Sequence, residues 1–189
     1  MIINKHIDKD NWYEIKDILP DITEIKSLNL SHTRLTEFPK MSHITIKGDF
    51  YCNNNKIASF KNCPNINGDF WCYYNQLTSF KDCPNVGGDF NCVDNKIISF
   101  KDCPPINGDF YCHGNQITSF KDFPEVGGYL YSDFDIFDKV HEYGKEKKIS
   151  LLEAQVELYN NQDEDILNHL DKFPDLVAYI RIKELNKLL

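Results

Sequence analysis

Four near-identical 20-residue segments follow one another in this chain, and the interval between them never changes. The copies begin at Gly48, Gly68, Gly88 and Gly108, and a shortened fifth copy begins at Gly128. A divergent unit with similar apolar spacing precedes them at residues 28–39. Because each unit of a short, regular repeat packs mainly on its two neighbours, this period constrains the chain to a solenoid.

Each copy starts with alternating apolar and polar residues. In the first copy, Phe50 and Cys52 alternate with Asp49, Tyr51 and Asn53. A period of two predicts a short strand with one buried face. Stacked copies place these strands side by side, about 4.8 Å apart, in a parallel sheet.

Other columns of the repeat also have structural interpretations. An asparagine column can hydrogen-bond to backbone groups where each turn bends. Its members are Asn55, Asn75, Asn95 and Asn115. The glycine that opens each copy is expected to re-enter the strand with a positive φ.

The column pattern Phe-x-Cys-x-x-Asn-x-Ile-x-x-Phe resembles the leucine-rich-repeat consensus, with Phe and Cys in place of most leucines. It is most similar to the short bacterial type, which has a Pro after each turn, and to Gly-Gly-Asp-Leu-Tyr-Cys repeat arrays of bacterial and tailed-phage proteins. The resemblance covers residues 28–132. It implies an α/β solenoid, a short leucine-rich-repeat array with a parallel β-sheet, and it is specific for this fold but not for one function.

Both open ends of a solenoid need a cap. Residues 1–27 are predicted to form an N-terminal cap with a short amphipathic helix at 10–19, which ends before Pro20. Residues 28–132 are predicted to form the solenoid, and residues 133–189 a C-terminal helical cap or subdomain. Four helices are expected in that last part, at about 133–147 and 150–159, from Asp163, and around Pro174.

Composition limits the classes of function. The net charge of −8 argues against sequence-independent binding to nucleic acid, which depends on basic groups. No apolar run is long enough for a membrane span, and the first residues do not resemble a signal peptide. We therefore expect a cytoplasmic protein, which would act in the host cytoplasm if it comes from a phage. The seven cysteines, an odd number without metal-ligand spacing, are expected to be reduced and buried. No metal or cofactor is expected.

The outward strand positions form the candidate binding site. Core columns are nearly uniform from copy to copy, whereas these outward columns vary, as positions that suit a partner can. Tyr and Trp are favoured anchors at interfaces. The predicted contact patch consists of Tyr51, Trp71, Tyr73, Tyr111, His113 and Tyr131. The alternative is that these side chains only cover neighbouring strands.

An aspartate column runs beside the aromatic positions and is assigned to the same partner-binding face. It consists of Asp49, Asp69, Asp89 and Asp109. Like charges about 5 Å apart repel by about 1 kcal/mol per pair in water, so an offsetting interaction is expected. The structural interpretation is that each carboxylate accepts backbone N–H groups at the turn. The functional alternatives are attraction of a basic partner, imitation of phosphates, or a bound divalent cation.

These features favour a non-enzymatic protein–protein interaction module, which contacts its partner through the strand face, the helical end, or both. The resemblance to phage and bacterial arrays implies an inhibitor that blocks a host defence or nucleic-acid-processing protein. One alternative is an acidic nucleic-acid mimic that competes for a basic DNA- or RNA-binding target. Another is a cryptic hydrolase, although no Ser/His/Asp or Cys/His pairing is visible and no catalytic residue is assigned. No oligomeric state is assigned.

Overall fold

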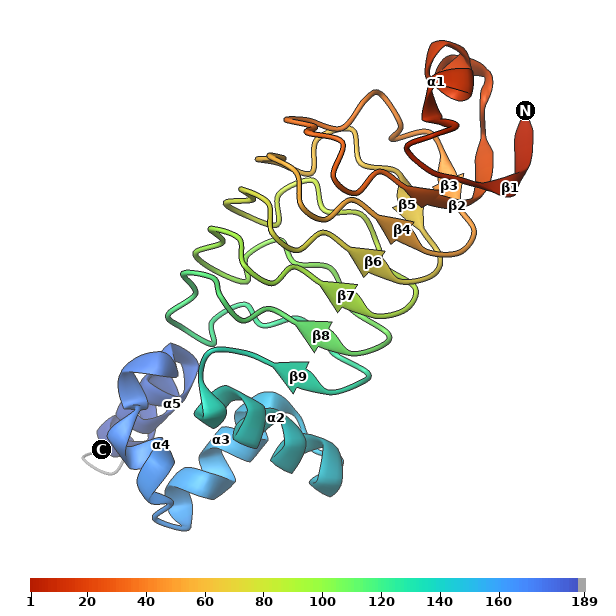
Figure 1. The fold of residues 1–189 in the computed structure, drawn as a ribbon. Helices are drawn as coiled ribbons and strands as arrows, with labels where there is room; N and C mark the ends of the chain where they lie inside the picture. Colours follow the sequence, from red (N-terminus) through yellow and green to blue (C-terminus); the bar gives the residue numbers. More distant parts are fainter. Residues whose placement is uncertain (187–189) are drawn as a thin grey trace.

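The repeats wind into a parallel β-solenoid that is closed at one end by helices (Figure 1). The computed structural model describes residues 1–186, with the backbone alone at Lys5, His6, Tyr13 and Ile15. The parallel solenoid with a helical end confirms the predicted fold class. The division into three parts with the boundaries given above stays a prediction.

The first ladder of strands carries the outward face that the repeat predicts. It runs through β2 (Glu24–Asn29), β4 (Phe50–Tyr51), β6 (Phe70–Trp71), β7 (Phe90–Asn91), β8 (Phe110–Tyr111) and β9 (Leu130–Tyr131). Pairing is parallel and in register, so Phe50 pairs with Phe70 and Phe70 with Phe90. In each of these pairs the Phe is buried and the residue after it points outward, as a period of two requires.

A second, shorter ladder runs along another side of each turn. It begins with β3 (Thr45–Ile46) and β5 (Asn65–Ile66) and continues as single bridges from Ile66 through Val86 and Ile106 to Val126. Strand β2 is long enough to pair with β3 at one end and with β4 at the other. The ladders therefore start from one strand and separate in later turns.

The N-terminal end differs from the single helix expected at residues 10–19. Strand β1 (Ile2–Ile7) pairs with β2, and helix α1 is confined to Trp12–Ile15, followed by a 3₁₀ helix at Lys16–Asp21 that contains Pro20. Oδ1 of Asn11 accepts the N–H of Asp8 at 2.8 Å, and Oδ1 of Asp8 accepts the N–H of Asn11 at 3.2 Å. These two bonds hold residues 8–11, which precede α1, in a turn. The side chains of Tyr13 and Ile15, on which the amphipathic pattern partly depends, lie outside the described part.

Phenylalanine stacks form the core of the solenoid. The rings of Phe50, Phe70, Phe90 and Phe110 stack with centroids 5.4–5.6 Å apart. A second column packs edge-on against them, for instance Phe60 against Phe70 at 6.1 Å. Offset and edge-to-face ring pairs of this kind stabilise a core beyond the area that they bury.

The asparagine ladder forms as predicted. Asn75 donates through Nδ2 to the carbonyls of Cys52 and Cys72, both at 3.0 Å, and its Oδ1 accepts the N–H of Ile57 at 3.0 Å. One buried side chain thus satisfies backbone groups of two successive turns. The same bonds recur at Asn95 and Asn115.

The expectation of a positive φ at the opening glycines is wrong. Among the described glycines only Gly114 has a positive φ. A Cβ on Gly68, Gly88, Gly108 or Gly128 would instead lie 2.1–2.5 Å from the Oδ1 of an aspartate in the turn before. Glycine is required there because two turns approach too closely for a side chain.

The left-handed positions lie elsewhere in the repeat, in two columns of mostly Asn, Asp and Gly. One column consists of Asn54, Tyr74, Asp94 and Gly114, and the other of Asn62, Asp82, Asp102 and Asp122. Asn, Asp and Gly are the residues that tolerate this conformation best.

The four predicted C-terminal helices are all present. They are α2 (Asp135–Lys147), α3 (Leu151–Asn160), α4 (Glu164–Asn168) and α5 (Pro174–Leu185). Ser150 and Glu153 form the predicted capping box, and Asp163 caps α4. A 3₁₀ turn at Leu170–Lys172 precedes α5.

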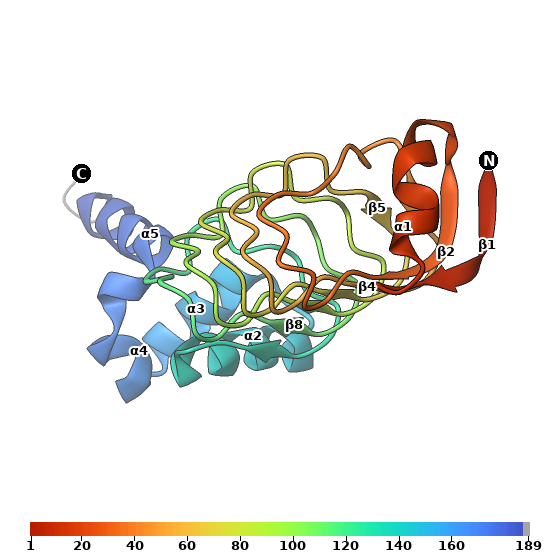
Figure 2. The same ribbon diagram turned by 45° about the horizontal axis from the view of Figure 1, so that its top comes forward.

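Helix α2 lies against the last turn, opposite the end that carries β1 and α1 (Figure 2). Phe137 of α2 packs on Phe120 of that turn with ring centroids 4.7 Å apart, and both contact Phe173. The N–H of Phe120 also donates to the carbonyl of Lys172 at 2.8 Å. These contacts cover the apolar end of the solenoid.

Within residues 1–186, no helix combines the length and apolar character needed to cross a membrane.

Candidate functional site

Four of the predicted contact residues form one continuous row, here called the aromatic row. Its members are Tyr51, Trp71, Tyr111 and Tyr131. Tyr51 stacks on Trp71 at a centroid distance of 6.3 Å and an interplanar angle of 8°, and Tyr111 stacks on Tyr131 at 4.5 Å and 3°. Asn91 occupies the row position between Trp71 and Tyr111, yet the two rings stack with centroids 6.3 Å apart. The stacked rings therefore form a continuous row across five turns of the solenoid.

Stacking between neighbours holds the rings of the row in place. Tyr51, Trp71 and Tyr111 are partly exposed, and Tyr131 is 41% exposed. Stacking restricts the rotamers of these side chains, so covering them costs little additional side-chain entropy. The indole Nε1 of Trp71 is enclosed and has no hydrogen-bond partner among the described residues, which leaves one donor of the row unsatisfied.

The next outward column belongs only partly to this surface. Tyr73 packs edge-on against Trp71 at 6.5 Å, and His113 is exposed. Asn53 and Val93, which the alternation places on the same face, are instead only 6% and 8% exposed. The strand ends after the Tyr51 position, and the chain then bends inward, so that the period of two no longer applies.

Sequence reasoning missed Tyr74, which extends the patch. Tyr74 is 55% exposed, and its ring lies edge-on to Tyr73 at 5.6 Å. Its φ of 52° places a bulky residue in a column otherwise filled by Asn54, Asp94 and Gly114. Left-handed backbone costs such a residue about 1–2 kcal/mol. The departure from Asn, Asp or Gly in this column is the sequence signal that could have revealed it.

The aspartate column, here called the acidic row, accepts backbone N–H groups as its structural interpretation predicts, but these groups belong to the next turn. The Oδ1 of Asp49 accepts the N–H of Asp69 at 3.0 Å, and that of Asp69 accepts the N–H of Asp89 at 2.8 Å. Asp89 and Asp109 repeat the bond to the next turn. These charge-assisted bonds offset the repulsion between neighbours and explain the retention of four aspartates.

The second carboxylate oxygens of Asp49 and Asp109 contact the aromatic row. The hydroxyl of Tyr51 donates to Oδ2 of Asp49 at 3.3 Å, and the hydroxyl of Tyr111 donates to Oδ2 of Asp109 at 3.2 Å. Burial and this bond to Asp109 raise the pKa of Tyr111 to about 12. Burial also raises the pKa of Asp69. The two rows therefore form one acidic and aromatic surface.

The cysteines lie away from this surface. All seven are free thiols. Five are buried as predicted, Cys52, Cys63, Cys72, Cys92 and Cys112, whereas Cys83 and Cys103 are only partly buried. Burial raises the pKa of the Cys52 thiol well above its ordinary value, and the others shift the same way for the same reason. Such thiols are poor nucleophiles. Across the described residues, no three His, Cys, Asp or Glu side chains converge as metal ligands would.

Comparison of the chain with protein families, with curated proteins and with solved structures finds no match in any of the three. Arguments about function therefore rest on the geometry of the chain itself.

Proposed function

We propose that this protein is a non-enzymatic interaction module that holds a protein partner against the aromatic and acidic rows. One observation supports this most: the stacked rings of the aromatic row lie partly exposed beside four aspartates on one face of the sheet. Large, preordered rings give contact area at low entropic cost. The strained, exposed Tyr74 at the edge of the row adds to it, because strain tends to persist where function requires it.

The partner expected from this surface is a protein with an apolar centre and basic residues around it. The acidic row keeps its negative charge while its Oδ1 atoms bind the backbone, so it attracts Lys and Arg side chains. The rings then supply most of the binding energy at the centre of the contact. The sequence resembles leucine-rich-repeat arrays of phage and bacterial proteins. If the surface of the partner that is covered is the partner's own active surface, the module acts as an inhibitor.

The proposal is tested by capture from a lysate of the source or host cell with three forms of the full chain: the unaltered protein, the Trp71→Ala/Tyr111→Ala variant and the Tyr179→Ala variant. Tyr179 lies on α5 and is 39% exposed, so it is a matched aromatic control remote from the strand face. A partner should be retained by the unaltered protein and by Tyr179→Ala but lost by the double variant. Equal retention by all three forms would show that the strand face is not the contact. Thermal unfolding of each variant checks that the fold persists.

A nucleic-acid mimic is separated from this function by a second variant. A mimic binds through charge, so Asp49→Asn/Asp89→Asn would release the partner while Trp71→Ala/Tyr111→Ala would retain it. The proposed module shows the opposite order, with a weaker and salt-dependent effect of the two Asn substitutions. Asn keeps the carbonyl oxygen that accepts the next N–H, so the ladder is preserved in this comparison.

A further inference from the structure

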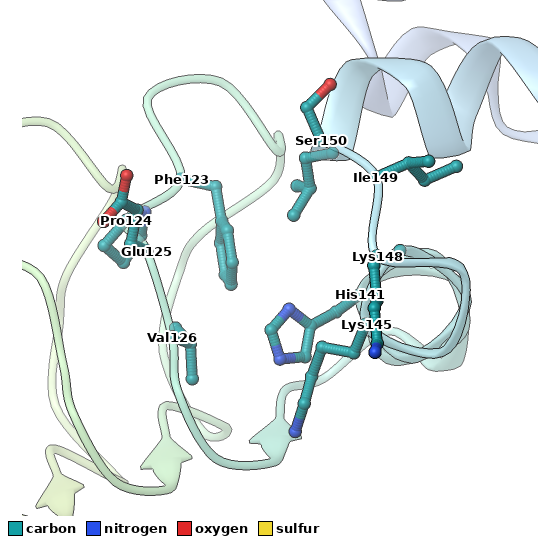
Figure 3. A pocket seen from close by; sticks show the side chains of 11 residues that line it. Phe123, Pro124, Glu125, Val126, His141, Lys145, Lys148, Ile149 and Ser150 are labelled. Carbon is teal, nitrogen blue, oxygen red and sulfur yellow. The ribbon is translucent and has the colours of Figure 1, made fainter.

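A cavity of about 410 Å³ lies where the last turn of the solenoid meets the junction of α2 and α3 (Figure 3). The segment 123–126 forms one side of the cavity, and the segment 141–151 forms the other. A volume of this size is typical of small-molecule sites, which occur preferentially between structural units. The cavity involves none of the residues of the aromatic row.

The cavity walls are mainly apolar. The side chains of Phe123 and Val126 come from the turn, and those of Ile149 and Leu151 come from the helical part. All four are only partly buried, although they pack against the hydrophobic core. A ring or short hydrocarbon chain between them would cover apolar surface that the protein leaves open.

His141 provides a polar group between the two sides of the cavity (Figure 3). It is only 3% exposed, and its Nε2 lies 3.1 Å from the carbonyl oxygen of Gly128. A carbonyl oxygen can only accept, so Nε2 carries the proton, and in the neutral ring Nδ1 is left as an acceptor. Nδ1 is enclosed and has no hydrogen-bond partner within residues 1–186. A buried, unpaired acceptor is a rare feature that calls for a donor.

Two lysines give this region a local positive charge in a protein of net charge −8. Lys145 donates to the same Gly128 carbonyl at 2.7 Å and lies 4.7 Å from the centroid of the Tyr129 ring. Lys148 is exposed and also lines the cavity. Among the described residues that line the cavity, Glu125 is the one acidic residue, so the lining favours an anion over a cation.

We propose that this cavity binds a small hydroxylated aromatic carboxylate. The ring lies between Phe123 and Leu151, the hydroxyl donates to Nδ1 of His141, and the carboxylate accepts from Lys148. The Phe123 ring centroid is 5.8 Å from that of the imidazole, so the enclosed nitrogen belongs to a ring that packs beside the proposed ligand position. This site is independent of the strand face.

The test is a set of NMR titrations of the full chain with 4-hydroxybenzoate, benzoate and phenol. 4-Hydroxybenzoate should bind most tightly, and loss of either the hydroxyl or the carboxylate should weaken binding about 3- to 10-fold, as expected for one hydrogen bond or one exposed charge contact. The shifts should map to the cavity lining, and the Nδ1 signal of His141 should move with 4-hydroxybenzoate but not with benzoate. The absence of saturable shifts at the lining would overturn the proposal.

Variants assign the two polar contacts. Lys148→Gln should weaken 4-hydroxybenzoate binding about 3- to 10-fold and leave phenol binding unchanged, whereas Lys101→Gln, an exposed lysine on the repeats, should change neither. His141→Phe should remove the advantage of 4-hydroxybenzoate over benzoate. If His141→Phe does not fold, the Nδ1 signal of the unaltered protein decides. Equal affinity of the unaltered protein for 4-hydroxybenzoate and benzoate, or no effect of Lys148→Gln, would contradict the assignment.

Discussion

Single residues in this protein often serve two turns at once. The aspartates of the acidic row accept a backbone N–H from the following turn, and the ladder asparagines donate and accept across successive turns. Polar side chains therefore stabilise the stack directly, although they lie next to the face proposed to bind a partner. Substitutions at these positions have to be interpreted for both effects.

At the residue scale, Asp69→Ala should destabilise the protein, and Asp69→Asn should not. Alanine leaves the N–H of Asp89 without its acceptor, at a cost of about 1–3 kcal/mol. Asparagine keeps an acceptor oxygen and removes a charge that lies between two others. Urea unfolding of the two variants measures the difference. Equal destabilisation would show that the charge, and not the hydrogen bond, maintains this position.

Tyr111 should titrate at an unusually high pH. Its folded pKa is raised to about 12 by burial and by its bond to Asp109, whereas an unfolded tyrosine titrates near 10. The folded state therefore holds the proton more tightly, so the associated stability is present below about pH 10 and is lost as the pH rises towards 12. Spectrophotometric titration at alkaline pH, with Tyr111→Phe as the comparison, measures this group. If the variant lost absorbance change near pH 10 and not near pH 12, the shift would be contradicted.

At the scale of elements, close approach decides where the chain tolerates side chains. Gly88 lies between two turns of the solenoid, and Gly144 lies within α2. The residue type is the same, but the surroundings differ. A Cβ on Gly88 would lie 2.1 Å from Oδ1 of Asp69, whereas a Cβ on Gly144 would meet nothing closer than 3.4 Å. The same substitution should therefore have opposite effects at the two sites.

We expect Gly88→Ala to destabilise the protein by about 2 kcal/mol or more, because the acidic row must shift to make room. Gly144→Ala should stabilise it by up to about 1 kcal/mol, because alanine favours the helix. Differential scanning calorimetry of both variants gives the two signs. A neutral Gly88→Ala variant would mean that the turns can separate without loss of the Asp69 bond.

At the scale of the whole molecule, the solenoid is a line of units in which each turn contacts mainly its neighbours. The first turn is covered by β1 and the last by α2, so the two ends are protected by different elements. In such a protein, local stability depends on the nearest cap and falls with damage to it.

Phe137→Ala should therefore loosen the helical end before the rest. Phe137 is 1% exposed, and its loss is expected to cost about 3–5 kcal/mol. Thiol labelling followed by mass spectrometry should show that Cys112, in the last complete repeat, reacts faster in the variant, while Cys52, in the first, keeps its rate. Equal acceleration at both cysteines would mean that the solenoid opens as one cooperative unit.

Local regularity made much of this structure predictable. The strand register, the buried Phe and Cys columns and the Asn ladder follow from a 20-residue period, because stacking repeats the same environment in each turn. The C-terminal helices followed from helical spacing, and two of them from their capping residues, Ser150 and Asp163. The aromatic row was also predictable in its membership, since alternation alone places Tyr51 and Trp71 outward, although its binding role stays a proposal.

The sequence by itself thus determined the solenoid, its register and the composition of its outward face. Only the tertiary structure decided the second ladder, the reason for the opening glycines, the burial of Asn53 and Val93, the exposed Tyr74 and the cavity above His141. Each of these depends on how closely segments approach when they are separated by a full turn or lie in different parts of the fold. Periodicity along the chain fixes which residues recur together, but it does not measure the distance between the backbones that carry them.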